Sequence, residues 1–216
     1  MTRRPGRLVV VTGTGTEVGK TWFAAATLAE LRALGATVAA RKPVQSFEPG
    51  AGATDAEVLA SATGEDPDAV CPPHRSLAVA MAPPMAADAL GAPGFTIADL
   101  AELHWPPATD LGLVEGVGGP RSPLAADGDT VDLVAALDPE LVVLVADAGL
   151  GAVNAVLLAA APFAGRSLVT ALNRFDADDD LHRRNREWLV ERARVDVVTN
   201  PRALAARVLP RRSVEA

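Results

Sequence analysis

Cysteine is almost absent from this 216-residue sequence, and no apolar run is long enough to span a bilayer. The single Cys71 cannot form an internal disulfide, which fits a reducing compartment and predicts a small, buried, apolar role for this residue. The longest apolar stretches, 141–148 and 152–161, are broken by aspartate, glycine and asparagine, so neither predicts a membrane span. The first seven residues contain no apolar segment typical of a signal peptide, and we therefore expect a cytoplasmic protein.

An excess of positive charge is also missing. The formal net charge of −7 argues against nucleic acid as a partner bound through net attraction. Lysine is also rare, since only Lys20 and Lys42 occur, against 18 arginines. An ammonium is a compact point charge and a guanidinium is planar and bulky, so the two are not interchangeable close to a phosphate. The two lysines are therefore predicted to mark positions where an ammonium is required.

Short β-branched runs alternate with alanine- and leucine-rich amphipathic stretches along the chain. This alternation is typical of βαβ units and predicts a single α/β domain over residues 1–216, with a mostly parallel β-sheet flanked by helices. The predicted strands lie at 8–12, 36–41, 111–114, 141–146, 167–172 and 195–198. The predicted helices lie at 20–34, 55–63, 85–90, 97–103, 131–137, 152–160, 180–194 and 201–208. Between them, the glycine-containing stretch 47–53 predicts a mobile loop.

The first predicted strand runs into a glycine-rich turn that ends in Gly-Lys-Thr. Gly15 and Gly19 allow backbone N–H groups to turn inward around phosphate oxygens, and the following helix offers its positive end to an anion. In such a turn, Lys20 reaches the β- and γ-phosphates and the Thr21 hydroxyl binds Mg²⁺. The turn predicts a P-loop NTPase-like fold and a nucleoside triphosphate ligand. A helix-capping turn in an unrelated α/β protein is the alternative, and the spacing directly after an apolar strand disfavours it.

A P-loop site needs an acidic partner for Mg²⁺, usually at the end of a neighbouring strand. Glu115 ends an apolar strand and is followed by glycines that permit close approach of a phosphate, so it is the favoured metal ligand. Asp147 also follows an apolar strand but lacks such a turn, and we predict a capping or loop carboxylate there. Asp55 lies in the first turn of a helix, where a helix-dipole role and a metal role fit the spacing equally well.

The second lysine follows the second predicted strand and should enter the same crevice as the first. Pro43 stiffens the turn after Lys42, and Ser46 can offer a hydroxyl to a substrate. Two ammonium groups beside a γ-phosphate suit phosphoryl transfer to an anionic acceptor such as a carboxylate, because they offset the charge repulsion. A surface lysine at a strand end is the alternative for Lys42.

Taken together, five motifs resemble those of the dethiobiotin synthetase family and occur in the same order. They are Gly13–Thr21, Lys42–Ser46, Asp55, Val114–Gly119 and Leu150–Asn154. The resemblance implies an ATP- and Mg²⁺-dependent ring closure in biotin biosynthesis. In that family an amine of 7,8-diaminononanoate takes up CO₂ to form a carbamate, which ATP converts to a carbamic–phosphoric anhydride. The second amine then closes the ring and expels phosphate.

The resemblance also implies roles for individual residues and a homodimer. Lys20 and Lys42 would be catalytic, and the metal ligands would be Thr21, Asp55 and Glu115. The substrate contacts would come from Ser46, Gly151 and Asn154. The segment Gly149–Asn154 of one subunit would hold the distal carboxylate of substrate bound to the other subunit. The nucleotide-binding residues would be Gly13, Gly15, Thr16, Glu17, Val18, Gly19, Lys20, Thr21, Trp22, Asp55, Glu115, Gly116, Val117, Gly118, Asn173, Pro201, Arg202 and Ala203.

Two differences from the family pattern concern the carboxylate pocket and the dimer contact. Ala155 stands where a histidine usually follows the asparagine, and Ala82–Pro84 replaces a Ser-Pro-His segment. These differences leave open a paralogous P-loop enzyme with a changed carboxylate substrate. A ParA/MinD-type switch ATPase is a further alternative, but such proteins carry an extra lysine near the start of the loop, where Thr12–Thr14 stands here.

The remaining histidines, tryptophans and arginines predict no further site. The histidines are too scattered to predict a metal centre and are expected at the surface or at helix ends: His74, His104 and His182. Core packing is the default expectation for Trp22 and Trp188. Five arginines between positions 183 and 194 share one predicted helix with acidic residues, which predicts a solvated face with ion pairs.

Overall fold

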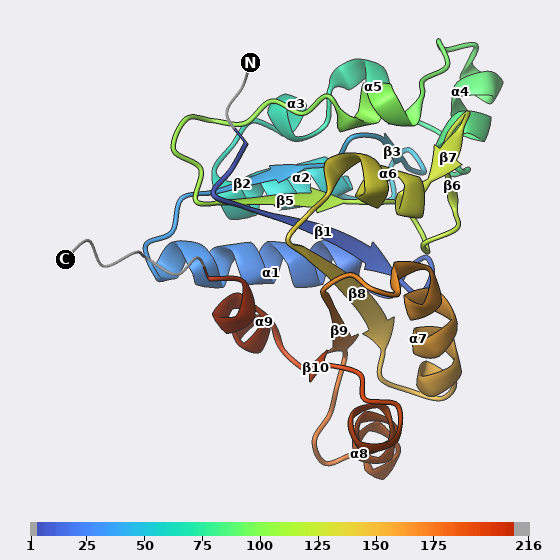
Figure 1. Cartoon of the computed structure of the whole chain (residues 1–216). Coiled ribbons are helices and arrows are strands. Elements are labelled where there is room, and N and C mark those ends of the chain that lie inside the picture. The colour runs from blue at the N-terminus through green and yellow to red at the C-terminus, as the bar shows by residue number, and fades with distance from the viewer. Residues whose placement is uncertain (1–3, 210–216) are drawn as a thin grey trace.

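Six strands form one parallel sheet at the centre of the molecule (Figure 1), in the order β10-β9-β8-β1-β5-β2. The structure is a computed structural model that describes residues 4–209, so the outermost residues of the predicted domain, 1–3 and 210–216, lie outside the described residues. The strands are β1 (Arg7–Gly13), β2 (Val38–Arg41), β5 (Leu111–Glu115), β8 (Leu141–Asp147), β9 (Leu168–Asn173) and β10 (Val197–Val198). All six predicted strands are therefore present, and the predicted α/β class is confirmed.

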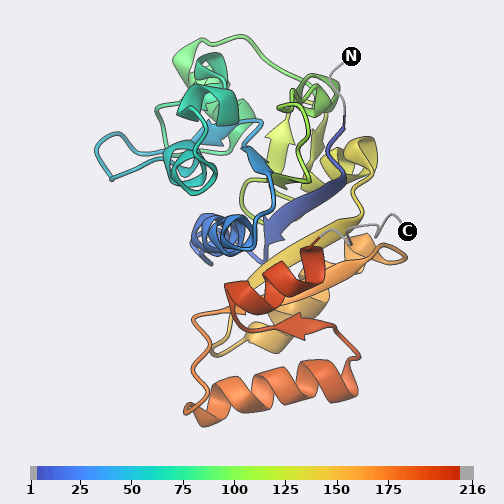
Figure 2. The ribbon, with the colours of Figure 1, turned by 90° about the vertical axis from the view of Figure 1, so that its left-hand side faces the viewer.

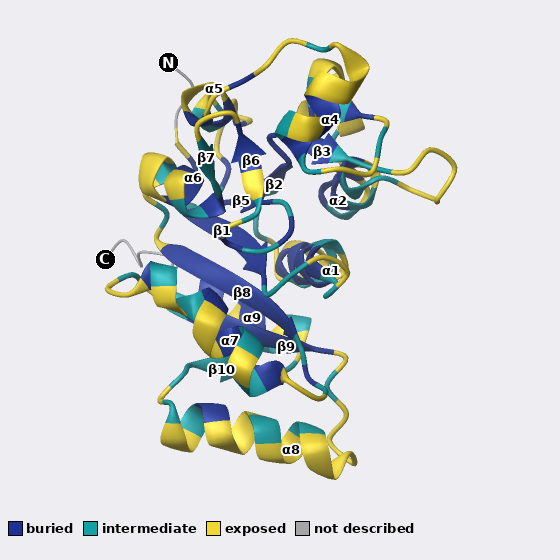
Figure 3. Cartoon of the chain, turned by 90° about the vertical axis from the view of Figure 1, so that its right-hand side faces the viewer, coloured by how far each residue is buried: buried dark blue, intermediate teal, exposed yellow. Residues whose placement is uncertain are grey.

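Helices cover both faces of this sheet, as the alternation of side chains along β1 requires. Val9 and Val11 face one cluster of buried side chains, whereas Leu8 and Val10 face another. The first face packs against α1 (Lys20–Ala33), α2 (Asp55–Thr63) and α9 (Pro201–Val208). The second face packs against α5 (Ile97–Ala101), α6 (Thr130–Leu137) and α7 (Ala152–Ala160). Figure 3 shows the central strands as a continuous buried layer, which is why they read as unbroken apolar runs.

Several short elements between β2 and β8 escaped the sequence prediction. They comprise α3 (Pro67–Val70) and two small sheets that pair β3 (Gln45–Ser46) with β4 (Ser76–Leu77) and β6 (Pro123–Ala125) with β7 (Gly128–Asp129). Strands of two or three residues are too short to leave a readable period. The helix predicted at 85–90 is present as α4 (Pro83–Leu90). The start of α4 was predicted two residues late, because prolines occupy its first positions, where they are tolerated. The stretch 47–53 contains no helix or strand.

The late helix lies at the β10 end of the sheet, where Figure 2 shows it in orange at the bottom of the molecule. It consists of α8 (Asp180–Glu187) and one π-helical turn over Trp188–Arg192, so it ends before the predicted residue 194. Asp180 pairs with Arg183 and Arg184 at helical spacing, which confirms a solvated, ion-paired face. Among the described helices, none has the length and apolar character needed to cross a membrane.

The prediction of core packing for both tryptophans was wrong. Trp22 is 58% exposed and Trp188 is 55% exposed. In α1 the buried stripe runs through Phe23, Thr27 and Leu31, and position 22 lies beside that stripe on the helical wheel. In the late helix, Leu189 takes the buried position next to Trp188.

Candidate active site

The P-loop turn connects β1 to α1 and is held in place by the end of β9. Gly19 has a φ of +85°, a left-handed conformation that glycine adopts without steric cost. The Asn173 side-chain amide donates a hydrogen bond of 2.9 Å to the Val18 carbonyl, directly beside that turn. Inside the loop, Lys20 Nζ donates to the Gly15 carbonyl at 3.0 Å. Burial and the nearby Lys42 charge hold the pKa of Lys20 below its ordinary value.

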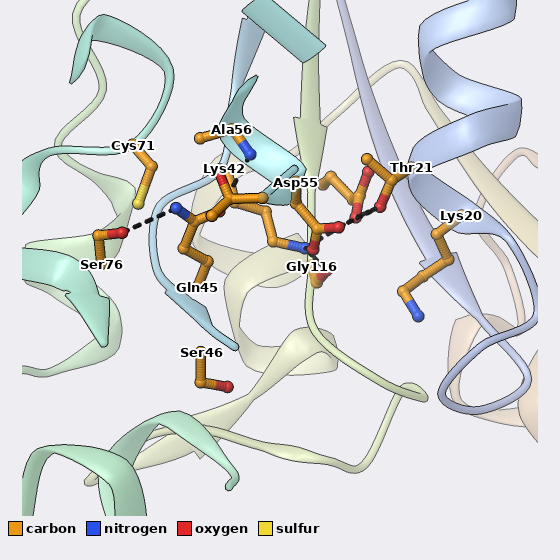
Figure 4. Close-up of polar contacts among 12 residues, drawn as sticks. Lys20, Thr21, Lys42, Gln45, Ser46, Asp55, Ala56, Cys71, Ser76 and Gly116 are labelled. Carbon is orange, nitrogen blue, oxygen red and sulfur yellow. Dashed lines mark hydrogen bonds and ion pairs between the residues drawn. The ribbon is translucent and has the colours of Figure 1, made fainter. Parts of the chain in front are cut away.

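Three oxygen-bearing side chains from different elements meet next to this loop (Figure 4). The register of β1 and β5 pairs Val11 with Glu115, so Glu115 lies alongside the strand that enters the P-loop. Thr21 Oγ1 lies 2.7 Å from Asp55 Oδ1 and 2.8 Å from Glu115 Oε1. Asp55 reaches this position because it opens α2, which the Thr54–Glu57 capping box fixes. Asp55 therefore lies in the first turn of a helix and also contacts the cluster, so the structure is consistent with both roles that the sequence left open.

Lys42 completes the cluster from the end of β2. Its Nζ lies 2.7 Å from Asp55 Oδ2, 2.7 Å from Glu115 Oε1 and 2.9 Å from the Gly116 carbonyl oxygen. Three acceptors thus use all three N–H groups of an ammonium that is only 1% exposed. The structure therefore places Lys42 inside the site and not at the surface.

The charges in this cluster stabilise one another. Burial opposes the charged form of Lys42, but the Glu115 and Asp55 carboxylates more than offset it and raise the pKa of this ammonium. Burial opposes the charged form of Asp55 too, yet the Lys42 ammonium keeps the pKa of this carboxyl below its ordinary value. Glu115 is wholly buried, and this burial raises the pKa of its carboxyl despite the neighbouring Lys42 charge. Because burial disfavours its charged form, Glu115 is the carboxylate whose ionisation depends most on a neighbouring cation.

The cluster fits a magnesium ion by its chemistry. Glu115 Oε2 is buried and accepts no hydrogen bond from the described residues. The single Thr21 hydroxyl proton cannot serve both of the carboxylates that it contacts. No group of three or more histidine, cysteine or acidic side chains able to hold a metal occurs within residues 4–209. The cluster itself offers two carboxylates and one hydroxyl. Mg²⁺ prefers such oxygen ligands and usually takes only one or two carboxylates, together with water and substrate phosphates.

A cavity of about 590 Å³ opens above the cluster. Both lysines line it, and so does Ser46, whose hydroxyl donates a hydrogen bond of 2.6 Å to the Met81 carbonyl. The segment 80–82 forms part of the wall, so the family difference at Ala82 falls inside this cavity. The full lining is Thr16, Glu17, Gly19, Lys20, Thr21, Lys42, Ser46, Asp55, Ala80, Met81, Ala82, Val117, Gly118, Ser122 and Pro123.

Some residues from the predicted site lie outside this cavity. Gly151 and Asn154 lie at the start of α7, next to Leu150, which is 93% exposed. Ala203 packs against the core and donates its backbone N–H to the Asn200 side chain, which caps α9. Arg202 is exposed at the start of the same helix. None of these four positions lines the cavity above the cluster.

Two residues of the site were missed by the sequence interpretation. Arg174 donates to the Glu17 carbonyl at 2.9 Å and to Asp147 at 2.8 Å, so it ties the P-loop to the end of β8. Asp147 also accepts from the Gly149 backbone N–H at 2.8 Å, which confirms its predicted role as a loop carboxylate. Ser122 lines the cavity and accepts a hydrogen bond of 2.9 Å from Gly119 N. Neither Arg174 nor Ser122 belongs to a motif of its own, so only the folded arrangement identifies them.

Cys71 is 2% exposed, which confirms the small buried role predicted from the sequence. Burial raises the pKa of its thiol to about 12. At pH 8 we therefore expect roughly one thiolate in ten thousand, and alkylation by iodoacetamide should be at least tenfold slower in the native protein than in guanidinium. Mass spectrometry of timed samples measures both rates. Equal rates in the two states would show that the thiol is open to solvent.

Comparison with known proteins agrees with this geometry. A family model described as an AAA domain matches residues 7–199. The chain is 36% identical to the ATP-dependent dethiobiotin synthetase BioD of Haloferax mediterranei over 88% of this chain and 82% of that protein. It is 39% identical to the enzyme of the same name from Anaeromyxobacter dehalogenans, over 81% of this chain and 79% of that protein.

Solved structures support the fold independently. The signal recognition particle receptor FtsY from Elizabethkingia anophelis, in complex with GDP, superposes with a TM-score of 0.53 at 14% identity. The match covers 98% of this chain and 65% of the receptor, and at such low identity it bears on the fold alone. The P-loop NTPase-like fold expected from the sequence is therefore confirmed. By its sequence relatives, the chain belongs to the ATP-dependent dethiobiotin synthetase family.

Proposed function

We propose that this protein is a ligase that uses ATP and CO₂ to close the ring of dethiobiotin on 7,8-diaminononanoate, in biotin biosynthesis. The family membership supports the reaction. The observation that carries the proposal is the convergence of Thr21, Asp55, Glu115 and Lys42 beneath one cavity lined by the P-loop. Such a site combines an anion-binding helix start with oxygen ligands for a cation and a second ammonium.

The reaction has three bond-forming steps. An amine nitrogen attacks CO₂ and loses a proton to give a carbamate. A carbamate oxygen then attacks the γ-phosphorus, and the bond between that phosphorus and the ADP oxygen breaks. The second amine attacks the carbamoyl carbon, phosphate leaves, and a proton passes to solvent. The second step brings the carbamate anion to the triphosphate anion, so we expect positive groups to provide most of the catalysis there.

The two lysines are proposed to provide this charge from opposite sides of the phosphoryl group. Lys20 donates one N–H to Gly15, and its other two have no acceptor in the described part of the chain, so they can face a phosphate. Lys42 has all three N–H groups engaged and must release one of them to reach the carbamate. Its partner Asp55 has a side chain 42% exposed, which makes that bond the easiest to exchange.

The metal would be held by Thr21, Asp55 and Glu115. A bound Mg²⁺ would neutralise charge on the phosphate oxygens. Gly116–Gly118, in the turn after β5, would approach the substrate amines and phosphate, and the Ser46 hydroxyl would orient the substrate. Val117, Gly118 and Ser46 line the cavity. The backbone N–H groups of the loop 13–19 would hold the triphosphate.

A homodimer and a cytoplasmic location belong to the same proposal. Gly151 and Asn154 lie outside the cavity of their own chain, next to an exposed Leu150, and this supports a carboxylate-binding role toward a second subunit. The start of α7 is a suitable place for a carboxylate, because no side chain caps it and a helix start attracts anions. The buried free Cys71 supports a reducing compartment.

Phosphate release from ATP tests the proposal directly. We expect release to require both 7,8-diaminononanoate and bicarbonate, and mass spectrometry should detect dethiobiotin in equal molar amount. Lys20→Met, which removes the ammonium from the loop, is the matched inactive control. Phosphate release at the same rate without either co-substrate would indicate a switch ATPase instead. Phosphate release that depends on a different acid would indicate a paralogue, as the Ala155 difference allows.

A further inference from the structure

A second cavity of about 660 Å³ adjoins the first one at the P-loop. Gly19 lines both cavities, so a molecule whose phosphates occupy the first cavity can extend past this glycine into the second. The second cavity lies between the start of α1, the end of β9 and the start of α9. Its lining is Gly19, Trp22, Phe23, Asn173, Arg174, Phe175, Thr199, Asn200 and Pro201. The inference below rests on the proposed use of ATP.

The polar side chains of this cavity are partly engaged with the protein itself. The Asn173 amide nitrogen donates to the P-loop, and the Arg174 guanidinium bonds to Glu17 and Asp147. The Asn200 side-chain oxygen accepts the Ala203 backbone N–H at 2.8 Å. These bonds leave the Asn173 side-chain oxygen and the Asn200 side-chain nitrogen for the edge of a nucleobase. The ring face of a base must instead meet the apolar surface of the cavity.

Trp22 supplies the largest apolar ring on this surface. Trp22 is 58% exposed and lies on the first turn of helix α1. The neighbouring Phe23 is 1% exposed and packs against the indole in a T-shaped pair, with ring centroids 6.2 Å apart and planes at 72°. A core residue therefore supports the indole. An exposed, supported aromatic ring next to a phosphate-binding loop is the arrangement that stacks on a planar base.

We propose that Trp22 is the stacking platform for the nucleobase and sets a preference for purines over pyrimidines. A base stacked on an aromatic side chain gains roughly tenfold to hundredfold in affinity, and the gain follows the area of the overlapping rings. Since every base has a π-face, the platform accepts all four nucleotides and ranks them by ring size. The triphosphate contacts do not depend on this ring.

Calorimetry with Mg²⁺ complexes of ATP, GTP, CTP, UTP and inorganic tripolyphosphate tests the proposal. We expect Trp22→Ala to weaken ATP and GTP roughly tenfold to hundredfold, CTP and UTP less, and tripolyphosphate not at all. Trp22→Phe should keep part of the affinity. Trp188→Ala is the matched control, because this tryptophan is 55% exposed but does not line the cavity. In a Trp188→Phe background, ATP should quench the tryptophan emission, and Trp22→Phe should remove most of that quenching.

Two results would overturn the platform while leaving nucleotide binding intact. One is wild-type affinity of Trp22→Ala for all four nucleotides. The other is an equal loss for tripolyphosphate, which would mean that the substitution disturbs the P-loop and not a base contact. Failure of the wild-type protein to bind any nucleotide would instead overturn the proposed function, so the two ideas fail separately.

Discussion

Replacing Lys42 with arginine is expected to lower the turnover number for phosphate release roughly 100- to 1,000-fold. Three acceptors surround the ammonium at 2.7 to 2.9 Å, and the side chain is 1% exposed. A planar guanidinium cannot place its donors on these three oxygens, and it is too large for the space. Nucleotide affinity should remain within a few fold, because the loop 13–19 does not use this side chain. Phosphate-release kinetics and calorimetry with MgATP measure the two effects.

Arg41→Lys is the matched control for this variant. Arg41 is 7% exposed and pairs with Glu65 at 2.7 Å, but it packs against Trp105 and does not line the active-site cavity. The reverse cation exchange, one residue away, should lower the melting temperature and leave turnover near the wild-type value. Near-wild-type turnover by Lys42→Arg, with the same fold by circular dichroism, would show that this ammonium has no chemical role.

The parallel sheet could be predicted because strands that are buried on both faces consist mostly of consecutive apolar residues. β1, β5 and β8 are unbroken apolar runs, and the structure buries almost every residue in them. The π-helical turn at Trp188–Arg192 and the two-residue strands could not be predicted, since neither repeats for long enough to show a period. Whether such short elements form depends on tertiary packing.

The centre of the site could also be predicted from the sequence, because strand ends show where side chains gather. Lys42 follows β2 and Glu115 ends β5, and parallel strands end at the same edge of a sheet. Convergence of these two residues therefore follows from topology. Asp55 opens the helix α2, so the sequence left its role open. The exposed ring of Trp22 and the bridge made by Arg174 do not follow from topology, because both depend on which way a side chain turns at the end of an element.

Replacing Gly19 with alanine is expected to disrupt the nucleotide site more broadly than any side-chain exchange within it. The backbone φ of +85° costs an alanine about 1–2 kcal/mol. A Cβ atom there would also lie 2.1 Å from Asn173 Nδ2, so the hydrogen bond from Asn173 to Val18 must break, at a further cost of about 1 kcal/mol. The melting temperature should fall by roughly 5–10 °C. MgATP affinity should fall roughly 100-fold, because the displaced turn no longer presents its backbone N–H groups to the phosphates.

Two further variants separate strain from collision. Gly35 has a φ of +84°, and no other atom lies within 4 Å of the place that an alanine Cβ would take, so Gly35→Ala should show only the strain and bind MgATP normally. Gly19→Ala combined with Asn173→Ala removes the colliding amide and should recover part of the lost melting temperature. Equal stability of the single and double variants would mean that the amide moves aside freely. In that case backbone strain alone, and not the contact between β9 and the P-loop, would account for the requirement for glycine at this position.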